Sequence, residues 1–347
     1  MQSRKSVLIV AITAIGVLCT SCEPKNPTPE KPFSRFPTQS IKYDGDNVPI
    51  SKEINTIDCT GAITCKTLYS YDVSSSEYTP TGKILYYVLD GKDTTETFTY
   101  LNNNYVIESK NESYSELNHI YLDIYTSDDH ISYILNQRME TILDNNYQTK
   151  EVITYLRNGS GSLYKYLNVE YFYDEFGKNT STLSHYRNTS EKITSTSKVE
   201  YFYNPDGQTS YELHSEKAAG LLDYTPTSQT IYSYDNLNLV KSVYYQYYSK
   251  GYHKSSQYEV FLDEQFHKKN GTTFYYNDGT VNYMIVNETI LEDNVRTLIT
   301  YRGKALQALT PTNRTTNTLD NYSRTTKEVR ESYNEGYYVT ETTINKY

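Results

Sequence analysis

A phrase built on two tyrosines recurs about every thirty residues along this chain. It stands at Tyr171–Asp174, returns at Tyr201–Asn204 and returns again at Tyr232–Asp235. The 347 residues include 40 tyrosines and no tryptophan, so the phrase is part of an unusual composition. Self-similarity at a fixed period of this length is typical of repeat architectures, in which one supersecondary unit packs beside the next. The sequence therefore predicts a repeat fold.

Turn-forming residues divide the repeats into two interleaved series. Asp, Asn and Gly predominate in both series, because they tolerate left-handed turn geometry and hydrogen-bond their own backbone. Asp174–Gly177 is typical of a type I turn with glycine at the bulge position, and Asn270–Gly271 is a hairpin signal. The spacing of the two series also places Asn111 and Asp123 in predicted turns.

The segments between these turns are rich in Tyr, Thr, Val, Ile and Ser, a composition that favours β-strands. Each repeat of ~30 residues then contributes two strands, and the predicted fold class is all-β: a long antiparallel meander of about twenty strands. At ~4.8 Å per strand, a flat sheet of this size would be ~95 Å wide, so strand twist must curl it. We expect a trough, an open shell or a coil, and the spacing alone leaves open whether the curl closes.

Strand alternation directs the repeated tyrosines to one face of the sheet, which we expect to line the inside of the curl. These residues are Tyr171, Tyr173, Tyr201, Tyr203, Tyr232 and Tyr234. In one interpretation the rings are core, because a sheet poor in aliphatic residues has little else with which to bury a face. In the other, part of the set forms an exposed aromatic platform that binds a ligand. We expect core positions for at least four of the six.

The first residues form a targeting segment, which does not belong to the folded domain. Arg4 and Lys5 precede an apolar stretch, Val7–Leu18, that is too short to span a bilayer well. The small residue Ser21 followed by Cys22 then resembles the lipobox of bacterial lipoproteins. This resemblance implies that Cys22 is lipidated and becomes the new N-terminus, and an ordinary cleaved secretory signal is the alternative.

A proline-rich stretch follows Cys22 and is typical of an extended spacer. The predicted organisation is a signal peptide at 1–21, the lipidated cysteine with its tether at 22–60, and a repeat domain at 61–347. The resemblance to lipoproteins implies attachment to the outer membrane, on its periplasmic face or at the cell surface.

Cys59 and Cys65 have a spacing that fits a small disulfide loop in an oxidising compartment, and two free thiols are the alternative. No second Cys or His pair with zinc-ligand spacing lies near them in the sequence, so we expect neither a metal site nor a cofactor. His185 and His214 are separated by nearly one repeat, which fits either a pair on neighbouring units or two unrelated strand histidines. The formal net charge of -9 disfavours nucleic acid as a partner, because an acidic surface repels phosphate.

The tyrosine phrase resembles the YD repeats of the RHS and teneurin group, whose unit reads Tyr-x-Tyr-Asp-x-x-Gly. Tyr171–Gly177 matches this unit in full, whereas Tyr201–Gly207 has Asn204 in place of the aspartate. The resemblance implies strand-rich repeats. Together with the lipobox, it implies a likeness to lipid-anchored proteins of Bacteroidetes, many of them of uncharacterised role.

No nucleophile elbow, HExxH motif, P-loop or dinucleotide fingerprint is present in the sequence. We therefore expect a lipid-anchored envelope protein, not an enzyme, that binds a glycan or another envelope protein or serves as a scaffold. One alternative is a polysaccharide-processing enzyme with acidic residues in the trough of the sheet. A structural module for the assembly of envelope proteins is the other.

Replacing Cys22 with alanine is expected to release the protein from the membrane, because the predicted lipid is its anchor. Metabolic labelling with a fatty-acid probe, followed by membrane fractionation, measures both effects. Labelling of the variant at the wild-type level would show that the anchor is elsewhere.

Overall fold

The computed structural model describes residues 36–58, 60, 62–235, 238–248, 251–262, 268–277, 280–304 and 308–347, and these residues form 22 β-strands in one sheet. In chain order the strands are β1 (Gln39–Asp44), β2 (Pro49–Ile57), β3 (Ile63–Asp72), β4 (Glu77–Leu89), β5 (Lys92–Leu101), β6 (Asn104–Glu116), β7 (His119–Thr126), β8 (Ile134–Leu143), β9 (Thr149–Arg157), β10 (Leu163–Tyr173), β11 (Asn179–Arg187), β12 (Ile193–Tyr203), β13 (Thr209–Ala218), β14 (Thr225–Asp235), β15 (Asn238–Tyr248), β16 (Gly251–Leu262), β17 (Lys268–Asn277), β18 (Thr280–Glu292), β19 (Val295–Gly303), β20 (Thr310–Leu319), β21 (Thr325–Tyr333) and β22 (Tyr337–Lys346). Within this part of the chain, no helix has the length and apolar character needed to cross a bilayer.

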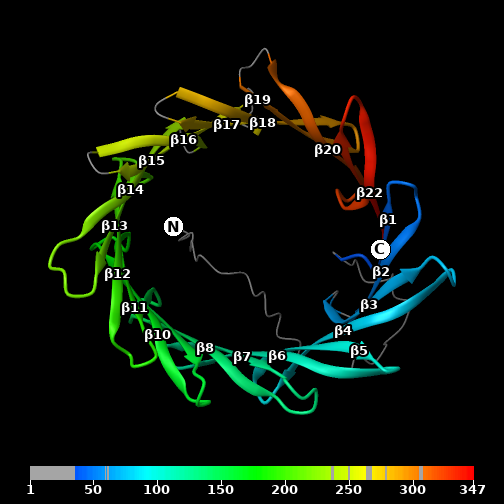
Figure 1. Cartoon of the computed structure of the whole chain (residues 1–347), viewed down its shortest axis with the longest axis horizontal. Helices are drawn as coiled ribbons and strands as arrows, with labels where there is room; N and C mark the ends of the chain where they lie inside the picture. Colours follow the sequence, from blue (N-terminus) through cyan, green and yellow to red (C-terminus); the bar gives the residue numbers. More distant parts are fainter. Residues whose placement is uncertain are drawn as a thin grey trace, which may run out of the picture.

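The sheet is an antiparallel meander that closes on itself. Each strand pairs with the next one along the chain, and β1 pairs with β22 as well as with β2. Within β1, Ile41 lies opposite Lys52 of β2 on one side and Ile344 of β22 on the other. Figure 1 shows the result end-on as a ring in which the first and last strands are neighbours. The all-β meander is confirmed, but the predicted trough, open shell or coil is wrong, because the sheet forms a closed barrel.

The strand that closes the barrel lies in the segment predicted to be tether. The described strands begin at Gln39, well before residue 61, where the repeat domain was expected to start. Side chains also join the seam: Lys42 Nζ lies 2.6 Å from a carboxylate oxygen of Glu341, and Ser40 donates a 2.6 Å hydrogen bond to Asn345. Closure pairs backbone groups that an open sheet would leave exposed along both edges.

The hairpin turns use the predicted aspartate and glycine. The Gly177 N–H donates to the Asp174 carbonyl at 3.0 Å, and Gly177 has a φ of 77° that favours glycine. The Asp174 carboxylate accepts hydrogen bonds from the backbone N–H groups of Phe176 and Lys178, both at 2.9 Å. The same two side-chain contacts, to the residues two and four positions later, recur at Asp44, Asp144, Asn158, Asn188 and Asp320. The predicted type I turn with its glycine bulge is therefore confirmed.

Three predicted turns are instead parts of strands. Asn111 lies within β6, Asp123 within β7, and Asn270–Gly271 within β17. A turn-forming residue marks a chain reversal only where its backbone is not paired with a neighbouring strand. At these positions the backbone is paired with a strand on each side. The chain between β6 and β7 reverses at Leu117–Asn118.

The stagger of the sheet determines which face lines the lumen. When directly paired positions are followed from β1 through every strand and back to β1, they end nearer the C-terminus of β1 than they began. Strands coil around a barrel in a right-handed sense, because each strand carries a right-handed twist. The Asp44 N–H donates to the Val48 carbonyl, on the side of β2. For an L-residue, this direction of the N–H and the stagger together place the Asp44 side chain in the lumen. Directly paired positions share a face, and following them around the sheet places Tyr171 and Tyr201 on the lumenal face as well. Asp123 and Arg138 are then on the outer face.

An ion pair between adjacent strands is the most buried contact of the outer face. The Asp123 side chain is 1% exposed and accepts two hydrogen bonds from Arg138, at 2.6 and 2.7 Å. The Tyr114 hydroxyl donates to the same carboxylate at 3.3 Å. Hydrogen bonding to Asp123 raises the pKa of Arg138 above its usual range. Apolar side chains contribute little to the buried positions among the described residues, where they are limited to Ala62, Ile153, Val243 and Met284.

Replacing Asp123 with alanine is expected to reduce the free energy of unfolding by about 3 kcal/mol, because Arg138 then loses its partner. Denaturant melts measure the change. The double variant Asp123→Leu with Arg138→Met is the control, since it removes both charges and should lose less stability than the single variant. A single variant within about 1 kcal/mol of wild type, as at ordinary surface sites, would contradict this account.

Candidate functional site

The six repeated tyrosines lie on one face of the barrel wall. Tyr171 and Tyr173 are on β10, Tyr201 and Tyr203 on β12, and Tyr232 and Tyr234 on β14; all six are half-buried. Direct pairing of Tyr201 with Glu212, and of Glu212 with Thr230, connects this face across β12, β13 and β14. The rings therefore line the lumen, neither fully enclosed nor fully exposed.

The second tyrosine of each phrase is tied to the backbone of the preceding strand. The Tyr173 hydroxyl donates to the Thr149 carbonyl and the Tyr203 hydroxyl to the Asn179 carbonyl, both at 2.6 Å. The third member of the set is the 2.8 Å bond from Tyr234 to Thr209. Each acceptor is the first residue of its strand, so one contact recurs at β9, β11 and β13. Three of the six repeated tyrosines thus use their hydroxyl groups to bond to the adjacent strand.

Burial also changes the acidity of these tyrosines. It raises the pKa of Tyr171, Tyr173, Tyr201, Tyr203 and Tyr234 above the usual value. Burial, followed by the charge and hydrogen bond of Glu212, raises the pKa of Tyr232 to about 12. Partial removal of these hydroxyl groups from water disfavours the charged phenolate, in keeping with the half-buried positions of the rings.

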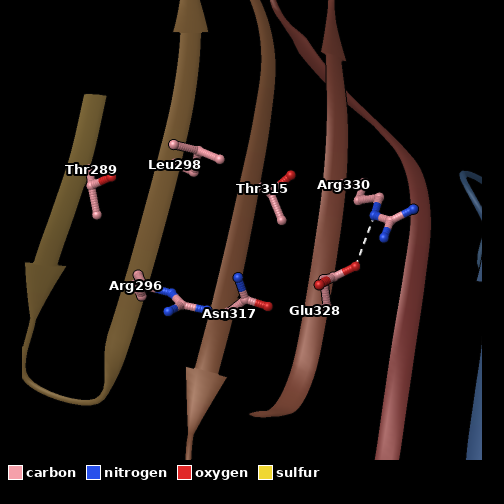
Figure 2. A pocket seen from close by; sticks show the side chains of 7 residues that line it. All are labelled: Thr289, Arg296, Leu298, Thr315, Asn317, Glu328 and Arg330. Carbon is pink, nitrogen blue, oxygen red and sulfur yellow. Dashed lines mark ion pairs between the residues drawn. The ribbon is translucent and has the colours of Figure 1, made fainter. Parts of the chain in front are cut away.

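A groove crosses the same lumenal face on β18, β19, β20 and β21. It has a volume of about 580 Å³ and is shown in Figure 2. The lining residues are Thr289, Arg296, Leu298, Thr315, Asn317, Glu328 and Arg330. One row of direct partners runs from Arg296 through Asn317 to Glu328, and a second runs from Leu298 through Thr315 to Arg330. The groove is therefore built from four strands held in fixed register.

The two arginines of the groove have different surroundings. Arg330 Nε lies 2.8 Å from a carboxylate oxygen of Glu328, and its Nη1 lies 3.5 Å from Glu341. Arg296 is exposed and has no ion pair within the described parts of the chain. In Figure 2 its side chain reaches toward Asn317, which is 7% exposed and lies between the two charged positions.

A third arginine joins this surface to the tyrosines. Arg302 is exposed on the same face of β19, and its guanidinium carbon lies 4.5 Å from the centre of the Tyr283 ring. Direct pairs lead from Tyr232 through Ser242, Tyr258, Thr273 and Ile285 to Arg302. The tyrosine rows and the groove thus share one continuous lumenal wall. Strand alternation in 295–303 already places Arg296 and Arg302 on one face, a signal that the sequence contains without any motif to mark it.

Other predicted site residues do not converge on this wall. His185 is on the outer face of β11, where it pairs with Thr196, and His214 is on the lumenal face of β13, where it pairs with Val199. The two histidines therefore cannot form a metal pair. No cluster of three or more His, Cys, Asp or Glu suited to a metal ion occurs in the described segments.

The predicted covalent sites fall largely outside the described residues. Cys22 and Cys59 both lie there. Cys65 lies on β3, where its sulfur is 3.9 Å from the Thr67 hydroxyl oxygen. Lipidation of Cys22 and a bridge between Cys59 and Cys65 stay predictions.

No known protein family and no curated protein matches the sequence. Among solved structures, a protein of unknown function from Bacteroides fragilis is similar with 18% identity and a TM-score of 0.29, over 33% of this chain and 87% of that one. A porin-like protein from Bacteroides uniformis is similar with 8% identity and a TM-score of 0.28, over 79% and 97% of the two chains. A protein from Lactobacillus plantarum has 7% identity and a TM-score of 0.29, over 89% and 96%. Likenesses this weak do not assign a function.

The tyrosine contacts lead to a graded stability series. Tyr→Ala at a core position is expected to lower the free energy of unfolding by ~3–5 kcal/mol, because it leaves a cavity. Tyr→Phe at Tyr173, Tyr203 or Tyr234 should cost about 1 kcal/mol, the loss of one hydrogen bond. Tyr171→Phe is the matched control, since no hydrogen bond of its hydroxyl occurs among the described residues. Near-wild-type denaturant melts for three or more of the six alanine variants would favour the platform instead.

Proposed function

We propose that this protein is a lipid-anchored component of a bacterial outer membrane that binds a ligand in the lumenal groove without transforming it. The observation that carries the proposal is Arg296: an exposed guanidinium, free of ion pairs within the described residues, beside the buried Asn317. Hydrogen-bond donors held on a rigid wall are suited to fix the orientation of a ligand. The predicted anchor at Cys22 supports the location.

The groove chemistry favours a glycan over a protein ligand. Thr289 and Thr315 offer hydroxyl groups that both donate and accept, and Asn317 offers an amide that does the same. Leu298 is 41% exposed and provides an apolar surface for the C–H face of a sugar ring. The mixture matches the alternating hydroxyl and C–H surfaces of a carbohydrate. In the alternative scaffold role for envelope assembly, another protein would contact the same lumenal wall.

An enzyme that cleaves glycans is the second candidate, and the carboxylates disfavour it. Glycoside hydrolysis uses two carboxyl groups that flank the bond to be cleaved. Among the lining residues of the groove, Glu328 alone carries a carboxylate, and Arg330 holds it in an ion pair. The groove therefore lacks the pair of carboxyl groups that this reaction needs.

Calorimetric titration of the folded domain with a panel of soluble polysaccharides tests the proposal. We expect saturable binding to at least one polysaccharide and no increase in reducing ends after prolonged incubation. Thr315→Val should weaken binding, because it removes a hydroxyl from the groove and keeps the side-chain shape. The outer-face substitution Thr316→Val on the same strand is the control. New reducing ends would support the enzyme, and absence of binding across the panel would overturn the proposal.

A further inference from the structure

We propose that the groove selects a polysaccharide that carries carboxylate groups, such as a polymer of uronic acids. This inference rests on the proposed function and specifies the chemistry of its ligand. Its basis is the guanidinium of Arg296 in the groove, the balance of charge around it and the spacing of the lumenal guanidinium groups.

Several arginines of the barrel are tied to carboxylates of the protein, whereas Arg157 and Arg187, at the ends of β9 and β11, have no ion pair among the described residues. Arg138 pairs with Asp123, Arg314 pairs with Glu331 through two contacts at 2.5 and 2.6 Å, and Arg324 lies 2.7 Å from Asp320. Arg296 lacks such a partner among the described residues as well, and it is the arginine without one that lines the groove. A guanidinium matches a carboxylate with two parallel hydrogen bonds, so a carboxylate ligand would complete the arrangement that the paired arginines already have.

The balance of charge around the groove favours an anion. Lys42 and Arg330 share Glu341, and Arg330 also holds Glu328, so these two cations and two anions offset one another. Arg296 then adds a positive charge that this network leaves unbalanced. In a chain with a formal net charge of -9, a local excess of positive charge on the lumenal wall is a specific feature and not a consequence of composition.

The spacing of the guanidinium groups indicates a polymer. Arg296 and Arg302 lie on the same face of β19 and are six residues apart, which corresponds to ~20 Å along an extended strand. Leu298 and Thr300 occupy the positions between them on that face. A single sugar cannot contact both arginines, whereas an oligomer with a carboxylate on each unit presents anions along the whole distance. An acidic polypeptide shares the charge but lacks the hydroxyl groups that Thr289 and Thr315 would bind.

Titration with polygalacturonate and with the same polymer after methyl esterification tests the inference, because the ester removes the carboxylate charge and keeps the sugar backbone. We expect the acid to bind and the ester to bind at least tenfold more weakly. Affinity for the acid should fall as salt is raised, because exposed charges are screened.

Arg296→Ala should weaken polygalacturonate binding about tenfold, the effect of losing ~1.4 kcal/mol, and the double variant with Arg302→Ala should weaken it further. Lys327→Ala is the matched control, since Lys327 is an exposed cation on the outer face of β21 and its loss should leave affinity unchanged. Thermal melts of each variant verify folding.

Equal binding of the acid and the ester would overturn the carboxylate selectivity and leave the proposed function intact. Binding of a neutral polysaccharide alone would have the same consequence. Binding of polyglutamate with no binding of polygalacturonate would replace the glycan with an acidic protein. If no polymer binds, both the inference and the proposed function fail.

Discussion

The backbone pairing between β1 and β22 is the contact on which the barrel depends. Without it, β1 and β22 would each present a row of unpaired N–H and C=O groups, and a sheet with such edges pairs readily with other chains. With it, the wall becomes a ring in which each strand is held on both sides. Within this ring, the pairing of β19 with β20 places Arg296 beside Asn317, and the pairing of β12 with β13 places Tyr201 beside Glu212.

A wall one sheet thick cannot bury a conventional core, and the protein stabilises each face differently. On the outer face, charged groups pair across strands, as Asp123 does with Arg138. On the lumenal face, tyrosines provide large rings, and those at the end of each phrase bond to the preceding strand. The hydroxyl of tyrosine makes this possible, because it satisfies a backbone carbonyl while the ring covers its neighbours. The abundance of tyrosine and the scarcity of buried aliphatic residues therefore have the same cause.

The candidate site lies on a part of the lumenal wall where charged groups lack partners among the described residues. Most polar groups of the wall have partners within the protein, whereas Arg296 and Arg302 present guanidinium groups with no carboxylate partner in the described segments. Binding a ligand there requires little reorganisation, because the flanking strands already hold the side chains in position. A pre-organised groove of this kind suits recognition more than catalysis.

The sequence by itself determined the alternation of strands and turns, because the preferences of residues for strands and for turns are local. The left-handed position of Gly177, the side-chain bonds of Asp174 and the shared face of the repeated tyrosines all follow from residue types at fixed spacing. Local rules also misplaced Asp123 and Asn270–Gly271, since a turn residue can equally occupy a strand whose neighbours satisfy its backbone. Only the tertiary structure decided that the sheet closes, that β1 belongs to it, and that His185 and His214 lie on opposite faces. Closure depends on the stagger accumulated over all 22 described strands, and the faces of the two histidines depend on how β11, β12 and β13 pair; a single segment of the chain contains neither.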